Sequence, residues 1–336
     1  MKLAKIGLIA LCSAVVVLTG CAKKSDNLTI KFNSVTTADT PKGKAIELFK
    51  KLVEERSQGK IKVETHHNST LYKDKEETEA LQNGAIQMAA PSLAKFGPMG
   101  LKEFELFDLP YLFNDFNDVH KVTQGPVGQE LMKLTEPKGV TGVAFWDNGL
   151  KIMSANKPLK TVEDYKGLKM RIQSSKVLDA QMRSVGALPQ VIPFSEAYQA
   201  LSTGVVDGTE NPPSNLYTQK MHEVQKHATL TNHGLLAYMV IANKKFWDGM
   251  TPEQKTIVEG ALKEATDYAN KIAQEENDQA LEKVKASGKT TVYTPTAEER
   301  SALKKTMVTM HAEVDTKVGG GWLKKMYDAV GFDPTK

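Results

Sequence analysis

The chain has 336 residues, of which 40% are hydrophobic and 25% are charged, a composition typical of globular proteins. This length favours two lobes, each large enough to bury its own core. The formal charge of +4 falls to +2 without residues 1–20, which contain Lys2 and Lys5 and no acidic residue. Such an even balance of charge gives no indication of a nucleic-acid-binding surface.

The N-terminus has the layout of a bacterial export signal. An apolar run from Ile6 to Leu18 follows a short basic segment, and it is too short to cross a bilayer, which takes roughly 20 residues. The run ends in Leu18-Thr19-Gly20-Cys21, which resembles the lipobox of bacterial lipoproteins, where the cysteine is acylated. We therefore expect a signal peptide at 1–20, a lipid anchor on Cys21 and a polar tether at 21–27. An ordinary signal peptide with an incidental cysteine is the alternative.

Short strands alternate with helices from residue 28 onward, which predicts an α/β fold with parallel strands. Strands are expected at 28–32, 61–63, 86–88, 168–173, 191–192 and 205–210, and helices at 40–56, 75–83, 177–185 and 195–202. The helix at 40–56 has the clearest start, with Thr40 as N-cap and Pro41 in the first position. One long strand or a strand pair is expected at 139–153, bent at Trp146–Gly149, and a strand at 238–242 returns to the first sheet.

A long helix is expected after Thr251-Pro252. Apolar residues keep helical spacing to Val284, and no Gly or Pro interrupts the pattern between Gly260 and Gly288, a length of about 40 Å. A coiled-coil helix is disfavoured because the apolar stripe lacks sustained heptads. We expect the helix to span both lobes. Lobe I is predicted to contain 28–148 plus about 237–276, and lobe II 149–236 plus about 277–336, with a ligand cleft between them.

A series of ordered segments carries a family resemblance. These are Lys31-Phe32, Thr40–Gly43, Asn68–Leu71, Phe107–Phe113, Asn148–Lys151, Ser154–Pro158, Gly167–Gln173, Phe194–Tyr198, Val206–Pro212 and Gln219–Gln225. With them, residues 28–316 resemble the DctP-type solute-binding proteins of TRAP (tripartite ATP-independent periplasmic) transporters. The resemblance implies a two-lobed, type II-like periplasmic-binding-protein fold with a hinge and an interlobe cleft. It also implies a small and a large membrane subunit as partners.

The same resemblance suggests which residues bind the ligand. In the family one arginine holds a ligand carboxylate, and that position is Arg171, whose guanidinium offers two parallel donors. Asn211 corresponds to a polar contact for the same carboxylate, Lys151 to a second cation and Phe194 to an apolar wall. Position in the family also places six further residues along the cleft, namely Ser34, Ser92, Lys95, Asn148, Ser174 and Tyr238.

A second cation favours a four-carbon dicarboxylate such as succinate, malate or fumarate as the ligand. A keto acid, a monocarboxylate or a sugar acid is the alternative. The chain departs from its nearest relatives in pattern at Ser34, where they have His, and at Pro212-Pro213, where they have Thr-Trp. The loss of a large aromatic side chain beside Asn211 would reshape the pocket.

Other functional classes find less support. His222 and His227 flank an acidic residue as in a metalloprotease, but a spacing of five puts them about 140° apart on a helix. No nucleophile elbow, phosphate loop or dinucleotide fingerprint occurs, and the two cysteines are Cys12 and Cys21. We therefore expect no enzymatic activity, cofactor or metal. A binding protein that serves an ABC importer or a sensor kinase would close its cleft about a hinge in the same way. Only the family resemblance favours a TRAP transporter.

Overall fold

The computed structural model describes residues 27–334. The predicted signal peptide, the lipidation site at Cys21 and all of the predicted tether except Asn27 lie outside the described residues. Within 27–334, no helix has both the length and the apolar composition needed to cross a membrane.

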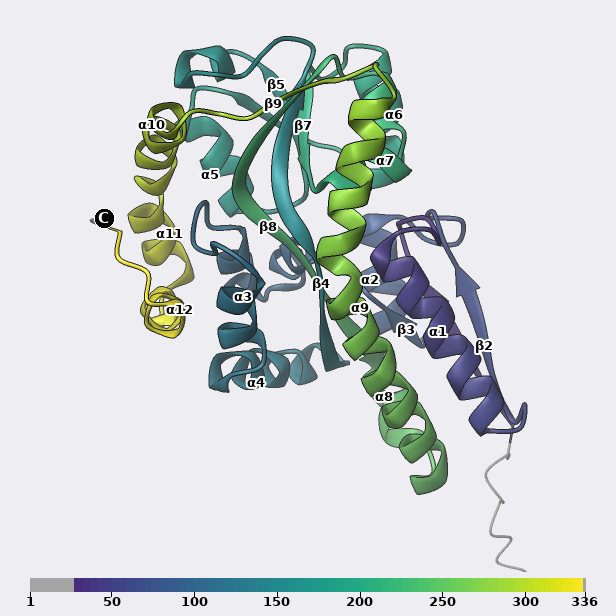
Figure 1. Ribbon diagram of the computed structural model, residues 1–336. Helices are drawn as coiled ribbons and strands as arrows, with labels where there is room; N and C mark the ends of the chain where they lie inside the picture. Colours follow the sequence, from purple (N-terminus) through teal and green to yellow (C-terminus); the bar gives the residue numbers. More distant parts are fainter. Residues whose placement is uncertain (1–26, 335–336) are drawn as a thin grey trace, which may run out of the picture.

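One nine-stranded sheet runs through both lobes (Figure 1). Its strands are β1 (Leu28–Asn33), β2 (Ile61–His66), β3 (Met88–Ala89), β4 (Val140–Ala155), β5 (Lys169–Ile172), β6 (Leu188–Val191), β7 (Gly208–Asn211), β8 (His227–Asn243) and β9 (Thr291–Tyr293). The order is β2-β1-β3-β8-β4-β7-β5-β6, and β9 pairs with β8. The pairs β1–β2, β1–β3, β5–β6 and β5–β7 are parallel, as the alternation of strands and helices predicts.

Helices cover the sheet on both sides. They are α1 (Pro41–Arg56), α2 (Asp74–Gln82), α3 (Phe116–Thr123), α4 (Pro126–Leu134), α5 (Lys176–Ser184), α6 (Ala197–Ser202), α7 (Pro213–Thr218), α8 (Lys244–Gly249), α9 (Pro252–Ala286), α10 (Ala297–Val308), α11 (His311–Val318) and α12 (Trp322–Val330). Three short 3-10 helices matter below: η1 (Leu93–Lys95), η3 (Lys102–Asp108) and η6 (Phe194–Glu196). The predicted start of α1 is confirmed, because the Thr40 hydroxyl accepts a hydrogen bond from the Gly43 amide at 3.1 Å.

Each lobe has its own apolar core on each face of the sheet. In lobe I, one core lies between β1, α1 and the first half of α9, around Phe32, Phe49 and Trp146. Helices α3 and α4 and the 3-10 turns around Phe104 close the other face. In lobe II, α5 and α10 cover one face of the sheet and α6 and α7 the other. Residues of the other lobe also reach these cores, such as Val177 of α5 in a lobe I core and Ala94 and Tyr111 in a lobe II core.

Strands β4 and β8 join the lobes. They pair antiparallel along most of their length, from Val140 opposite Asn243 in lobe I to Ala155 opposite His227 in lobe II. The segment 139–153 is thus part of a single long strand rather than a strand pair. Its ladder is interrupted between Asp147 and Gly149, at the predicted bend, and such bulges bend a strand locally.

Helix α9 braces this crossing. Its 35 residues span about 52 Å at 1.5 Å per residue, and Figure 1 shows it running past both lobes. The Thr266 hydroxyl accepts a hydrogen bond from the Trp146 indole at 2.8 Å, and Asn277 donates to the Asn148 carbonyl at 2.5 Å. The helix is therefore tied to β4 at the start of the bend and within it.

The C-terminal helices depart from the predicted lobe boundary. Residues 277–336 were expected in lobe II, and α10 does pack there through Leu303 and Met307. Helices α11 and α12 instead contribute Val314, Leu323 and Met326 to the core of lobe I. The chain therefore crosses back to lobe I after α10, and its amphipathic C-terminal helices cover α3 and η3.

Candidate functional site

A small cavity lies between the two lobes. Lobe I contributes the loop after β1, the start of α2 and the η1 segment, and lobe II contributes the ends of β5 and β7 and the start of η6. The lining residues are Val35, Thr36, Asp74, Ser92, Lys95, Gln173, Phe194, Asn211, Asn215, Leu236 and Tyr238. The space they enclose is about 10 Å³, enough for about one water molecule. A four-carbon acid can enter only if the lobes separate.

Arg171 lies on β5 behind the lining residue Phe194 and is only 2% exposed. Its Nε donates to the Ile192 carbonyl at 2.9 Å, and its guanidinium carbon is 5.6 Å from the centre of the Phe194 ring. Burial lowers the pKa of Arg171, and the charges of Asp74 and Glu210 oppose that effect. In the described part of the chain its hydrogen bond is made by Nε alone. The terminal nitrogens can therefore meet an incoming carboxylate in two parallel hydrogen bonds.

Lys95 provides a cation on the opposite side, in lobe I. Its Nζ lies 2.6 Å from Asp74 Oδ1 and 3.0 Å from Glu77 Oε1. Burial alone would raise the pKa of Asp74, but the charges of Lys95 and Arg171 outweigh it and lower that pKa to about 2. Asp74 is therefore ionised at neutral pH, and Lys95 is held in one position by two carboxylates.

Tyr238 forms part of the cavity floor and is held by a polar cluster. Its hydroxyl accepts a hydrogen bond from the Asn148 amide at 2.8 Å, and the same amide group donates to Asn215 at 3.1 Å. The Lys42 ammonium lies 3.9 Å from the centre of the Tyr238 ring and donates to the Ala90 carbonyl at 3.0 Å. Burial lowers the pKa of Lys42 to about 7, so its charged and neutral forms coexist near neutral pH.

Lys151, the predicted second cation, belongs to a buried ion pair. It does not line the cavity but is fully buried beside it, with Nζ 2.8 Å from Glu210 and 3.6 Å from Asp108. His233 lies 3.1 Å from the other oxygen of Glu210. Burial opposes ionisation of Glu210, but Lys151 and His233 lower its pKa to about 2. The ammonium of Lys151 therefore already has two protein carboxylates as partners.

The other predicted site residues divide into two groups. Asn211, Phe194, Ser92, Lys95 and Tyr238 line the cavity together. Three do not. Ser34 is buried and bonded to the Thr36 hydroxyl at 3.1 Å, Asn148 lies behind Tyr238, and Ser174 is exposed at the start of α5.

Sequence reasoning missed Asp74, Gln173 and Asn215, which all line the cavity. Gln173 directly follows the predicted Arg171 strand and hydrogen-bonds Ser92 of the other lobe. It could have been found as the next polar residue at a strand end. Asp74 stands at the start of a helix, where an acidic residue has an ordinary explanation as a partner of the helix dipole.

Comparison with known proteins agrees with the two-lobed fold. The family described as DctP, bacterial extracellular solute-binding protein, family 7, matches residues 32–317. The chain belongs to this family. A DctP-family relative, the C4-dicarboxylate-binding periplasmic protein DctP of Rhodobacter capsulatus, is 58% identical over 88% of this chain and 89% of its own length.

Solved structures of DctP-type proteins support the same assignment. A TRAP periplasmic solute-binding protein from Sulfurospirillum deleyianum, solved with bound succinate, is 43% identical and superposes with a TM-score of 0.87. The match covers 90% of this chain and 99% of that one. A second, from Pseudomonas aeruginosa PAO1 with bound L-malate, is 41% identical with a TM-score of 0.83, over 85% and 99% of the two chains. TRAP solute-binding proteins bind small organic acids and act with membrane permease subunits.

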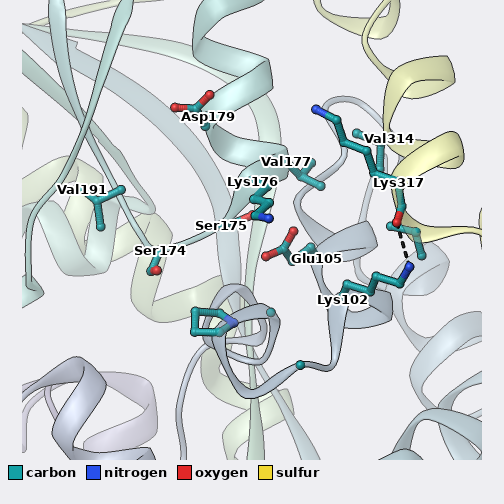
Figure 2. A pocket seen from close by; sticks show the side chains of 14 residues that line it. Lys102, Glu105, Ser174, Ser175, Lys176, Val177, Asp179, Val191, Val314 and Lys317 are labelled. Carbon is teal, nitrogen blue, oxygen red and sulfur yellow. Dashed lines mark hydrogen bonds between the residues drawn. The ribbon is translucent and has the colours of Figure 1, made fainter.

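A second interlobe feature of this DctP-family protein lies on its outer surface. Figure 2 shows residues that line a groove between η3 of lobe I, the start of α5 in lobe II and α11. The groove has a volume of about 820 Å³. Glu105 lies within it beside Ser175 and Lys176 and accepts a hydrogen bond from the Lys176 backbone. Burial, together with the nearby Asp108, raises the pKa of Glu105 to about 7. Glu105 of lobe I thus contacts the start of α5 in lobe II.

Proposed function

We propose that this DctP-family protein captures a four-carbon dicarboxylate between its lobes and delivers it to the membrane subunits of a TRAP transporter. The observation that carries the proposal is a pair of buried cations on opposite sides of the cavity. Lys95 lines the cavity from lobe I, and Arg171 lies in lobe II against the lining residue Phe194. A ligand with a carboxylate at each end can accept hydrogen bonds from both cations, whereas a monocarboxylate can reach only one of them.

Each carboxylate has its own partners in this proposal. Arg171 and Asn211 bind the first, since a guanidinium and an amide can donate to one carboxylate together. Lys95 donates to the second, in place of the Lys151 role that the sequence suggested. Ser92 and Gln173 meet across the cavity and exchange their mutual hydrogen bond for bonds to the ligand. The bound acid then stabilises the closed arrangement of the lobes by its contacts to both.

We further propose that the mature chain begins at Cys21, that the cysteine carries lipid, and that the protein acts outside the cytoplasm. The motif Leu18-Thr19-Gly20-Cys21 and the periplasmic location named for the Rhodobacter capsulatus relative support this. A lipid anchor would keep the protein near its membrane partners. Covalently attached lipid chains bind a protein to a membrane through the burial of their CH₂ groups.

Replacement of Arg171 tests the ligand-binding role. Arg171→Lys keeps the charge but loses the bidentate fork, so succinate affinity should fall about 30- to 1,000-fold, or roughly 2 to 4 kcal/mol. Isothermal titration calorimetry measures it. Arg183→Lys is the matched control, because Arg183 is exposed and bonded to Asp179 on its own helix. Binding by Arg171→Lys within threefold of the wild type would contradict the assignment.

A further inference from the structure

Two short segments from opposite lobes meet at the rim of the cavity. Lys73 and Asp74 begin α2 in lobe I, and Phe194 and Glu196 belong to η6 in lobe II. The Asp74 carboxylate accepts a hydrogen bond from the Phe194 backbone amide at 2.7 Å. Next to it, Lys73 Nζ lies 2.7 Å from Glu196 Oε1. Because α2 packs in the core of lobe I and η6 in a core of lobe II, both contacts exist only when the lobes are together.

The Asp74 contact is the stronger of the two. Lys73 and Glu196 are each half exposed, and exposed ion pairs contribute little. The Asp74 side chain is 17% exposed, and its other oxygen is held 2.6 Å from the Lys95 ammonium. Lys95 is itself fixed by Glu77 at 3.0 Å. The carboxylate that reaches lobe II is therefore preorganised, and charge-assisted hydrogen bonds of this kind are about twice as strong as neutral ones.

The segment that Asp74 binds is also the segment that holds Arg171. The Ile192 carbonyl accepts from Arg171 Nε, and the Phe194 ring lies against the guanidinium. A residue of lobe I thus fixes, on closure, the backbone that positions the ligand-binding arginine of lobe II. No ligand contact by Asp74 is needed for this effect.

We infer that Asp74 is a positioning residue for ligand capture, which locks the Ile192–Phe194 segment over Arg171 when the lobes close and so slows release of the bound acid. The inference rests on the proposed function. The contact forms after the ligand has entered the open cleft, so its loss should raise the dissociation rate and leave the association rate unchanged.

Stopped-flow measurements with succinate test this kinetic split, with tryptophan fluorescence as the signal. Asp74→Ala removes both hydrogen-bonding oxygens and should raise the dissociation rate about 10- to 100-fold. Asp74→Asn keeps an acceptor for the Phe194 amide but loses the charge, so its increase should be smaller. Glu79→Gln is the control on the same helix, because Glu79 is exposed and pairs only with the neighbouring Lys75 among the described residues. It should match the wild type.

The outcomes separate the two claims. If the wild-type protein does not bind succinate, the proposed function is wrong in its ligand, and the inference falls with it. If the wild type binds and both Asp74 variants release succinate at the wild-type rate, the positioning role is wrong while the proposed function stands. A fall in association rate with unchanged dissociation would likewise overturn it. Should Asp74→Ala fail to fold, the Asp74→Asn result decides.

Discussion

Lys151 offers a sharp test, because two different roles for it predict opposite results. Its ammonium is fully buried between Glu210, at 2.8 Å, and Asp108, at 3.6 Å. Lys151→Met keeps an unbranched side chain of similar length and removes the cation that pairs directly with Glu210. His233 stays 3.1 Å from the other Glu210 oxygen, but burial lowers the pKa of His233 and so disfavours its charged form. Removing one partner of a buried ion pair costs about 3 to 5 kcal/mol, since the remaining charge is uncompensated. The melting temperature should fall by roughly 6 to 20 °C.

Thermal unfolding followed by circular dichroism measures this loss, with Lys245→Met as the control. Lys245 is exposed on α8, so its replacement should change the melting temperature by no more than about 1 °C. Combining Lys151→Met with Glu210→Gln removes both charges of the pair and should recover part of the lost stability. At a temperature well below unfolding, succinate affinity of Lys151→Met should fall less than about tenfold. A variant as stable as the wild type that no longer binds succinate would refute the structural role and restore Lys151 as a ligand-binding cation.

Three further outcomes are expected. The native state retains the Glu105 proton up to about pH 7, whereas the unfolded chain releases it near its ordinary pKa of about 4.5. The free energy of unfolding therefore falls as the pH rises between these values. Glu105→Gln should stabilise the protein by about 1 to 3 kcal/mol at pH 8 but not at pH 4. Equal effects on thermal unfolding at both pH values would contradict this. A Cβ at Gly149 would lie 2.6 Å from Asn277 Nδ2, which is bonded to two backbone carbonyls. Gly149→Ala should therefore lower the free energy of unfolding by about 1 to 3 kcal/mol in chemical denaturation. An unchanged free energy of unfolding would show that the contact between β4 and α9 can adjust to the added methyl group. Cys21→Ser should move the protein from the membrane fraction to the soluble fraction of cells, and an unchanged distribution on immunoblots would argue against the lipid anchor.

The order of the elements could be predicted from the sequence because local signals were strong. The alternation of apolar residues marks the strands, Thr40-Pro41 marks α1, and Thr251-Pro252 marks the start of α9. The return of the chain to lobe I at α11 could not be predicted. Helix periodicity shows that a face is buried, but it does not show which core buries it.

The strand pattern alone did not reveal the site residues. Arg171 lies on the short strand β5, where alternation puts it on the same face as the exposed Lys169, and its role was inferred from the family resemblance. Lys151 lies on β4 between two interruptions of the ladder, at Asp147/Gly149 and at Lys151/Met153. Each such bulge shifts the alternation by one residue, so the sequence pattern does not reveal which way the lysine points. Asp74 was missed for a different reason, since its partners Lys95 and Phe194 are distant in the chain.

The most direct test of the central claim is calorimetric titration of the purified protein with a panel of organic acids. Succinate, fumarate and L-malate should each bind at one site per chain, about 100-fold or more tighter than propionate or glucuronate, because only a four-carbon dicarboxylate meets both Arg171 and Lys95. Tighter binding of a monocarboxylate or a sugar acid would contradict the dicarboxylate assignment. Absence of heat with every acid would contradict ligand capture by this cavity altogether.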